Sequence, residues 1–356
     1  MKILTVAGTR PQLVKIAAVS RKLRESFDEV LINTGQHYDY NLAGIFFEEL
    51  NIPKPDYNLE VGSDKHGIQT GKMMIKLEEI FEKEKPDMVL VYGDTNSTLA
   101  GALVAAKNLV PLVHIEAGLR SYNKSMPEEQ NRILTDHLSD LLFIPSKNAQ
   151  DNLDEEGLTN GVHLVGDVMM DAVLYNMKLA EKKHSLADYE LQQNEYILGT
   201  IHRAENTNNK EKLKAILDSF GKIEKDVYLP LHPRTKKLID DYNLAHYIYE
   251  YKNIKIVKPV SYLEMLFLVK NAYAVVTDSG GLQKEAYFCK VPCLTIRDQT
   301  EWTETIDEGW NKLINPLVDK LEHELKNISY GSNKTDLYGD GQAAEKIVSI
   351  LKNHNV

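Results

Sequence analysis

The chain has 356 residues, 43% of them hydrophobic and 26% charged, and carries a formal net charge of −10. This length exceeds what one hydrophobic core usually supports, and without a Lys/Arg-rich block a nucleic acid is excluded as the main partner. The first strand is too short for a signal peptide and no later segment is long and apolar enough to span a bilayer. We therefore expect a two-domain cytoplasmic protein with no membrane partner.

Apolar strand-like runs alternate with amphipathic helical patterns along the first half of the chain. This alternation predicts an α/β fold with parallel sheets covered on both faces. The predicted strands are 2–7, 29–33, 88–92, 112–115, 141–144 and 162–165, and the helical patterns are 11–23, 68–82, 97–107 and 129–139.

A second series of strands follows a polar, charged stretch at 178–194, which is typical of a helix end and a linker. The predicted strands of this half are 196–201, 227–231, 254–257, 274–277 and 293–296, and a helix with an apolar stripe closes the chain at 342–352. We predict two doubly wound Rossmann-like domains, 1–168 and 169–340, that face one cleft, with a separate C-terminal helical segment at 341–356.

Three carboxylates stand where polar groups collect around a ligand. Asp94 and Glu116 each follow an apolar strand, and Glu128 is expected in the loop after Ser125-Met126-Pro127. Ligands of parallel α/β sheets bind beyond the carboxyl ends of the strands, so these acids are expected to converge on one crevice and to transfer protons there. The alternative for Asp94 or Glu116 alone is a helix cap.

The turn after the first strand reads Gly8-Thr9-Arg10-Pro11 and opens a helix. It is not the GxGxxG fingerprint, so no nicotinamide cofactor is expected. Arg10 and Lys15 place two cations beside this helix start, which favours a phosphate clamp over a solvated surface pair.

A second phosphate site is predicted at Asp278-Ser279-Gly280-Gly281, between a strand and a helix. Two glycines at a helix N-terminus expose N–H groups to a diphosphate, and Glu285, one turn later, can accept hydrogen bonds from ribose hydroxyls. A plain tight turn is the alternative for Ser279, Gly280 and Gly281.

Histidines beside arginines end two strands of the second half. We interpret His202, and His232 with Arg234, as ligand contacts because of these positions, and Gln36-His37 as a weaker case. Trp302 either stacks on a base or packs. The two cysteines, Cys289 and Cys293, lack the further ligands of a metal site, so no metal is expected.

Read in order, the motifs GTRPxxxK, GDTNS, HIEAGLRS, PEExNR, HRxEN, LHPRT, DSGGxQxE and YGDGxA resemble the non-hydrolysing UDP-N-acetylglucosamine 2-epimerase family over nearly the whole chain. The resemblance implies a glycosyltransferase-B-like fold, a UDP-sugar substrate, a homodimer, and a C-terminal helix that crosses back onto the first domain. It assigns catalysis to four residues: Asp94, Glu116, Glu128 and His202. It places UDP against the phosphate-site residues Arg10, Lys15, Ser279, Gly280 and Glu285, to which our strand-end reading adds His232, Arg234 and Gly281.

The chemistry agrees with this resemblance. The proton on C2 of an N-acetylhexosamine has no adjacent ring carbonyl, so direct deprotonation and return is implausible. Elimination of UDP across C1–C2 and re-addition on the other face inverts C2 without any cofactor. That route needs acid/base groups and a cradle for the leaving diphosphate.

Several positions depart from the usual family pattern. Gln12 replaces a Glu, Trp302 lies in an altered TERPE motif, and Ala204 replaces the middle Arg of HRREN. The Gln12 and Trp302 forms resemble the branch that acts on UDP-2,3-diacetamido-2,3-dideoxy-glucuronate. Gln36 and His37 match part of an activating second-substrate site, whereas Asp39 and Ala204 do not fit its usual pattern.

The sequence motifs leave four other functions open. They are the sister epimerase of that branch, a hydrolysing epimerase that releases free N-acetylmannosamine, a glycosyltransferase, and a non-catalytic nucleotide-sugar sensor. Three acids exceed what binding neutral sugar hydroxyls requires, which argues against the sensor.

Overall fold

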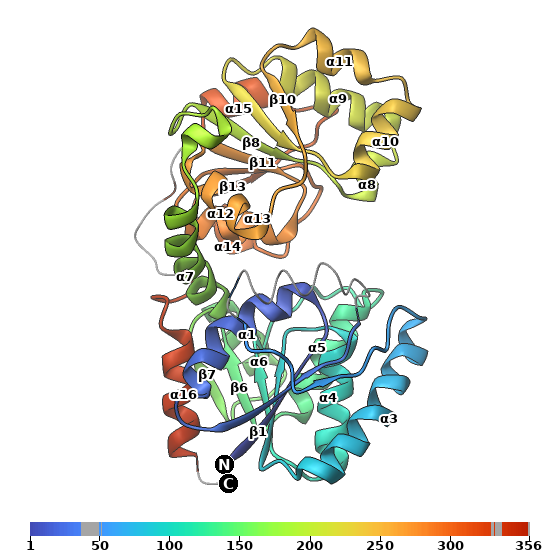
Figure 1. Cartoon of the computed structure of the whole chain (residues 1–356), viewed down its shortest axis with the longest axis vertical. Helices are drawn as coiled ribbons and strands as arrows, with labels where there is room; N and C mark the ends of the chain where they lie inside the picture. The colour runs from blue at the N-terminus through green and yellow to red at the C-terminus, as the bar shows by residue number, and fades with distance from the viewer. Residues whose placement is uncertain (37–49, 51, 329–330, 332–336, 355–356) are drawn as a thin grey trace. The chain divides into compact units, whose positions relative to one another are not determined.

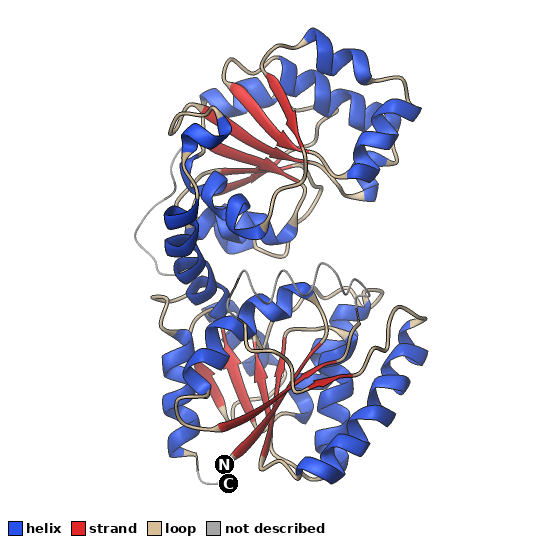
Figure 2. Cartoon of the chain, viewed as in Figure 1, coloured by secondary structure: helices blue, strands red, loops and turns tan. Residues whose placement is uncertain are grey.

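The computed structural model describes residues 1–36, 50, 52–328, 331 and 337–354, with the side chains of 248 and 249 left aside. The chain forms two compact units, each taken by itself below. Unit 1 comprises Met1–Tyr175 with Asp336–Val356, and unit 2 comprises Asn176–Thr335. Each unit is a parallel sheet with helices on both faces (Figures 1 and 2).

Unit 1 is built on a seven-stranded parallel sheet with the order β3-β2-β1-β4-β5-β6-β7. Its central strands β4 and β5 are buried along their whole length, and β1 is buried from Ile3 onward, which explains their largely apolar sequences. The strands are β1 (Lys2–Ala7), β2 (Asp28–Asn33), β3 (Tyr57–Asn58), β4 (Met88–Tyr92), β5 (Leu112–Ile115), β6 (Leu141–Ile144) and β7 (Val162–Leu164).

The helices of unit 1 begin where hydroxyl or proline residues favour a start. Thr9 precedes α1 with Pro11 in the first turn, and Thr95 accepts the Thr98 N–H at the start of α4. The helices are α1 (Arg10–Leu23), α3 (His66–Glu84), α4 (Asn96–Lys107), α5 (Pro127–Leu138), α6 (Lys147–Glu155), α7 (Val168–Lys183), which continues into unit 2, and α16 (Ala343–Asn353).

The C-terminal helix α16 packs beside α1 in unit 1, at the end of the chain coloured red in Figure 1. Its buried stripe includes Ile347, Val348 and Leu351, the 3.6-residue spacing that was visible in the sequence. Lys22 of α1 pairs with Glu345 of α16 at 3.1 Å.

Unit 2 repeats the same plan with six parallel strands in the order β10-β9-β8-β11-β12-β13. Its strands are β8 (Tyr196–Thr200), β9 (Asp226–Pro230), β10 (Ile254–Val257), β11 (Ala274–Thr277), β12 (Cys293–Thr295) and β13 (Asn311–Leu313). Its helices are α8 (Ala204–Thr207), α9 (Lys210–Gly221), α10 (Pro233–Asp241), α11 (Ala245–Glu250), α12 (Tyr262–Asn271), α13 (Gly280–Phe288), α14 (Thr303–Asp307) and α15 (Leu321–Lys326), with the 3₁₀ turn η1 (Leu186–Tyr189) before β8.

The strand order reverses between β1 and β4 in unit 1 and between β8 and β11 in unit 2. Open α/β sheets bind their ligands at the carboxyl end of such a reversal. Most of the predicted site residues therefore lie at the two positions that the topology favours.

The structure confirms the α/β fold class and every predicted strand to within one residue at either end, and corrects one placement. Glu128 lies not in a loop but in the first turn of α5, because Pro127 suits the first helical position and the two acids that follow favour a helix N-terminus. Among the residues that the structure describes, no helix has the length and apolar character needed to cross a membrane.

Candidate active site

The turn after β1 approaches the rest of unit 1 too closely for any side chain at Gly8. A Cβ there would lie 1.9 Å from Thr34 Oγ1 and 2.3 Å from Ser97 Oγ. Gln12 closes the turn from inside: its Oε1 accepts from the N–H groups of Gly8 (2.9 Å) and Thr9 (3.1 Å). Arg10, at the start of α1, is exposed at this turn.

Asp94 follows β4 and forms an ion pair with Arg132 of α5. Asn131 holds the same turn by donating from Nδ2 to the Asp94 carbonyl oxygen at 2.9 Å and to Asn96 Oδ1 at 3.2 Å. The Asp94 side chain is about 31% exposed, so it is both oriented and accessible.

Glu116 follows β5 in a left-handed backbone conformation, with φ at +70°. Such a conformation is costly for a residue other than glycine, and its occurrence at a strand end is typical of functional sites. The Glu116 carboxylate pairs with Lys15 of α1, and both side chains are largely buried. Lys15, predicted as part of a phosphate clamp, thus also fixes a predicted catalytic acid.

The two neighbouring acids of α5 have different surroundings. Glu128 is exposed, whereas Glu129 is 1% exposed and accepts hydrogen bonds from the N–H groups of Ser121 and Tyr122, both at 2.8 Å. Glu129 also lies 3.2 Å from Arg132, so it steadies the arginine that holds Asp94. Of the two, Glu128 is available to a ligand.

Gln36 lies beside the start of α4 in unit 1. Its Oε1 accepts from the Ser97 N–H at 3.0 Å and from Ser97 Oγ at 2.7 Å. The prediction for His37 falls on a residue outside those that the structure describes.

In unit 2, Asp278 organises the end of β8. Its fully buried carboxylate accepts from the N–H groups of His202 (3.1 Å) and Arg203 (3.0 Å) and from Asn206 Nδ2 (3.1 Å), and it lies 3.2 Å from His202 Nδ1. Asp278 thus holds both the backbone and the ring of His202 at the end of β8.

A pocket of about 280 Å³ opens at the strand reversal of unit 2. Its lining brings together five predicted residues: His202, His232, Ser279, Gly281 and Glu285. The remaining lining residues are mostly apolar: Thr200, Ile201, Pro230, Pro259, Val260, Met265 and Leu282.

Two polar groups of this pocket have assigned roles in the local fold. Ser279 caps α13 by accepting from the Leu282 N–H at 3.5 Å, which leaves the Gly280 and Gly281 N–H groups at the helix N-terminus. His232 Nδ1 accepts from the Arg234 N–H at 3.2 Å, so the proton of the neutral ring lies on Nε2.

Two predicted contacts lie away from this lining. Arg234 donates to Asn208 Oδ1 at 2.6 Å on the exposed side of α10. Trp302 packs on the first turn of α13, where its Nε1 donates to the Gly280 carbonyl oxygen at 3.0 Å and Lys284 lies 4.0 Å from its ring centre. Trp302 therefore packs within unit 2, which is one of the two interpretations of this residue.

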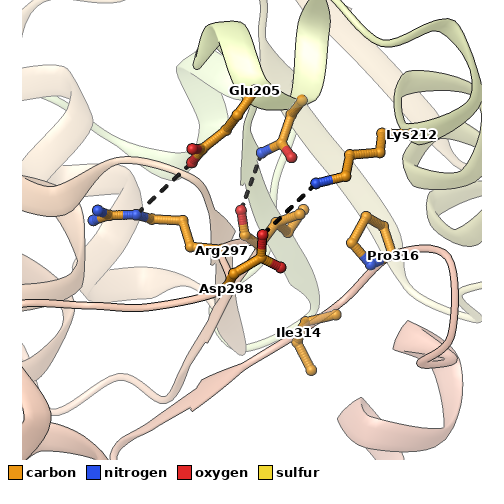
Figure 3. Close-up of a pocket in the computed structure, with 8 residues that line it drawn as sticks. Glu205, Lys212, Arg297, Asp298, Ile314 and Pro316 are labelled. Carbon is orange, nitrogen blue, oxygen red and sulfur yellow. Dashed lines mark hydrogen bonds and ion pairs between the residues drawn. The ribbon is translucent and has the colours of Figure 1, made fainter.

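A second hollow lies at the ends of β12 and β13, and Figure 3 shows its charged side chains paired with one another. Arg297 points toward Glu205 at 4.0 Å, and Lys212 toward Asp298 at 3.9 Å. In the described part of the chain, no three His, Cys, Asp or Glu side chains gather in the manner of a metal site.

The sequence motifs include Arg132 and Asp278, but no role of their own was predicted for these two residues. Arg132 stands four positions after Glu128 in PEExNR, one helical turn away, so the spacing itself placed both on one face of α5. Asp278 opens the DSGG motif at the end of a buried strand, the same signal that singled out Asp94.

Comparisons with known proteins agree with this geometry. The family model described as UDP-N-acetylglucosamine 2-epimerase matches residues 21–352. The chain belongs to the UDP-N-acetylglucosamine 2-epimerase family. A Methanococcus maripaludis protein described as a UDP-N-acetylglucosamine 2-epimerase homolog is 50% identical over 99% of this chain and 100% of its own length.

Two further relatives are named for different UDP-sugars. A Pseudomonas aeruginosa UDP-2,3-diacetamido-2,3-dideoxy-D-glucuronate 2-epimerase is 46% identical over 99% of both chains. The Methanocaldococcus jannaschii UDP-GlcNAc 2-epimerase, solved in complex with UDP-GlcNAc and UDP, has a TM-score of 0.85 at 45% identity and covers 99% of this chain and 100% of its own. The chain is thus an enzyme of an epimerase family with the glycosyltransferase-B-like fold.

Proposed function

We propose that this enzyme interconverts UDP-N-acetylglucosamine and UDP-N-acetylmannosamine without hydrolysing them to free sugar. The observation that carries the proposal is the pair Asp94 and Glu116, which end neighbouring strands of unit 1 and are each held by a cation. Carboxylates held in a fixed orientation are what proton transfer requires, and Asp94 is also exposed to a ligand.

The reaction proceeds by elimination and re-addition. A carboxylate removes the C2 proton, the C1–O bond breaks, and its electron pair leaves with the diphosphate of UDP, which gives a glycal. UDP then adds again at C1 while a proton is delivered to the opposite face of C2. By family resemblance Asp94, Glu116, Glu128 and His202 carry the proton transfers, and the cationic side chains of Arg10 and Lys15 stabilise the leaving diphosphate.

UDP is assigned to the pocket of unit 2. The apolar wall of Pro259, Val260 and Met265 suits a uracil ring, the N-terminus of α13 suits a diphosphate, and Glu285 suits ribose hydroxyls. His232 lines the same pocket, whereas Arg234 would need to leave Asn208 to contact UDP.

Incubation of the purified enzyme with UDP-N-acetylglucosamine alone, followed by NMR, tests this function. We expect the second UDP-sugar to accumulate, no free N-acetylmannosamine, and deuterium at C2 when the solvent is deuterated. Free sugar would identify a hydrolysing epimerase, and retention of the original C2 hydrogen would overturn the proton-exchange mechanism. Added NAD or EDTA should leave the rate unchanged.

A second substrate, the UDP-diacetamido-glucuronate of the Pseudomonas aeruginosa relative, is favoured by that relative's 46% identity. We place it second because Gln12, which resembles that branch, has a local role. Its Nε2 donates to the Tyr92 carbonyl oxygen at 2.8 Å and to Thr98 Oγ1 at 3.0 Å inside unit 1. A preference above tenfold in kcat/KM for the uronate, about 1.4 kcal/mol, would reverse this order.

The expected homodimer and the contribution of Gln36 and His37 to activation rest on the family resemblance. Sedimentation of the purified protein tests the first. A rate that rises more steeply than hyperbolically with UDP-N-acetylglucosamine, and that loses this curvature in Gln36→Ala, would support the second.

A further inference from the structure

A buried histidine on β5 connects the two turns that carry Asp94 and Glu116. His114 is fully buried, with Nδ1 2.6 Å from Asp136 Oδ1 and Nε2 2.7 Å from the Gly93 carbonyl oxygen. A carbonyl oxygen can only accept, so Nε2 carries a proton.

The other ring nitrogen also faces an acceptor. The second oxygen of Asp136 accepts from the Gly118 N–H at 3.1 Å and from Arg120 Nη1 at 2.6 Å, the pattern of an ionised carboxylate. Burial alone would raise the pKa of Asp136, but the charges of His114 and Arg120 hold it below its usual value. Both ring nitrogens of His114 therefore face acceptor atoms, so a single ring bridges Asp136 and the Gly93 carbonyl.

This pair joins backbone segments that flank the predicted catalytic acids. Gly93, held by His114, directly precedes Asp94, and Gly118, held by Asp136, stands two residues after Glu116. Gly93, Glu116 and Gly118 all have positive φ, at +62°, +70° and +79°. The turn at Gly93 is thus held by His114, and the turn at Gly118 by its partner Asp136.

Arg120 connects Asp136 to a further charged side chain, Glu156. Arg120 also binds Glu156 through Nε at 2.7 Å and Nη2 at 2.8 Å, and Glu156 lies 3.2 Å from His137. A buried ion pair is often no more stabilising than apolar residues of the same volume, so stability alone is a weak reason for this arrangement.

We propose that His114 and Asp136 are positioning residues that fix the relative placement of the Asp94 and Glu116 carboxylates during epimerisation. The proposal rests on the proposed function and assigns neither residue a contact with substrate. A shift of about 1 Å in a catalytic group can lower a rate about 10²-fold, so loss of either hydrogen bond should appear in turnover.

Two neutral substitutions separate the two bonds. In His114→Gln the amide nitrogen can reach the position of Nε2 and keep the bond to Gly93, whereas in His114→Asn it can reach that of Nδ1 and keep the bond to Asp136. We expect kcat to fall about 10²-fold in each, with UDP affinity unchanged. With C2-deuterated substrate the kinetic isotope effect should increase, because proton transfer becomes slower than the other steps.

His163→Asn, on strand β7 of the same sheet, is the matched control and should retain wild-type kcat and isotope effect. A merely structural role would lower the melting temperature of the His114 variants and leave kcat per folded enzyme and the isotope effect unchanged. That outcome would overturn the proposal.

Ring ¹⁵N NMR of the wild-type protein gives a test that requires no folded variant. We expect the ¹⁵N shifts to show both ring nitrogens of His114 engaged in hydrogen bonds, and a ring nitrogen without a hydrogen bond would overturn the proposal. Failure of the wild-type enzyme to epimerise would instead overturn the proposed function. The NMR result is obtained without substrate and distinguishes these two failures.

Discussion

The two units share one strand order but place different chemistry at its reversal. In unit 1 the strand ends carry acids paired with cations, Asp94 with Arg132 and Glu116 with Lys15. In unit 2 imidazoles follow β8 and β9, and the N-terminus of α13 follows β11, around a mostly apolar pocket. The topology thus selects where a site forms, and the residues that follow each strand select what it does.

The largest expected effect concerns the acids of unit 1. Asp94→Asn, Glu116→Gln and Glu128→Gln should each lower kcat about 10²- to 10⁴-fold and leave UDP affinity near wild type, because proton transfer is lost and the pocket is not. Steady-state kinetics and UDP titration calorimetry measure the two quantities.

Glu129→Gln is the control for Glu128→Gln, since the two acids are adjacent and only Glu129 is buried among backbone donors. Glu129→Gln should lower the melting temperature clearly and lower kcat only slightly. Near-wild-type turnover in Glu128→Gln would remove that residue from the proposed mechanism.

The next effect tests unit 2 with two neighbouring glycines. A Cβ at Gly281 meets nothing within 4 Å, whereas one at Gly280 would lie 2.7 Å from Glu301 Oε1. Gly281→Ala should therefore keep the melting temperature and weaken UDP binding about tenfold, about 1.4 kcal/mol, because its methyl group enters the phosphate position. Gly280→Ala should also keep the melting temperature, because the flexible Glu301 side chain, 38% exposed, can move away from the added methyl group. Unchanged UDP affinity in Gly281→Ala would place the diphosphate elsewhere.

The sequence predicted the strands because buried parallel strands leave unbroken apolar runs, and the polar residues after them are conspicuous. The strand order, and with it the position of the two reversals, was not predicted. The sequence did not predict the pairing of Lys15 with Glu116, since residues 101 positions apart meet only through the sheet. Nor did it separate Glu128 from Glu129, because exposure within one helical turn depends on how α5 packs. The short strand β3 and the short helices α8 and α14 carry too few residues for a periodic pattern.

An effect on stability is expected at Gln12, and it separates a role in folding from a role in substrate choice. Gln12→Glu replaces the Nε2 donor to the Tyr92 carbonyl oxygen with an acceptor in a buried site. The free energy of unfolding should fall by roughly 1–3 kcal/mol at neutral pH, and by less at acidic pH, where a protonated Glu can donate. Urea denaturation measures it. A changed ratio of kcat/KM between the two UDP-sugars would instead assign Gln12 to specificity.

The last prediction concerns the pH dependence of stability and compares two helix N-termini. One is capped by a carboxylate and the other lines a pocket. Asp171 of α7 accepts from the N–H groups of Ala343 (3.2 Å) and Ala344 (2.9 Å) at the start of α16, whereas the start of α13 lines the pocket of unit 2. Burial raises the pKa of Asp171 to about 6 despite these hydrogen bonds.

Because the pKa of Asp171 is higher in the folded than in the unfolded chain, the folded state holds the proton more tightly between about pH 4 and 6. Stability from this group is therefore fully present below the unfolded pKa and falls as the pH rises through 6. With 1.36 kcal/mol per pKa unit and allowance for partial exposure, the loss is about 1–2 kcal/mol. Asp171→Asn should flatten this part of the stability profile, measured by urea denaturation from pH 4 to 7.5, and leave UDP binding unchanged. A profile equally steep in the variant would show that α16 gains its hold on unit 1 from its apolar stripe against α1 and not from this carboxylate.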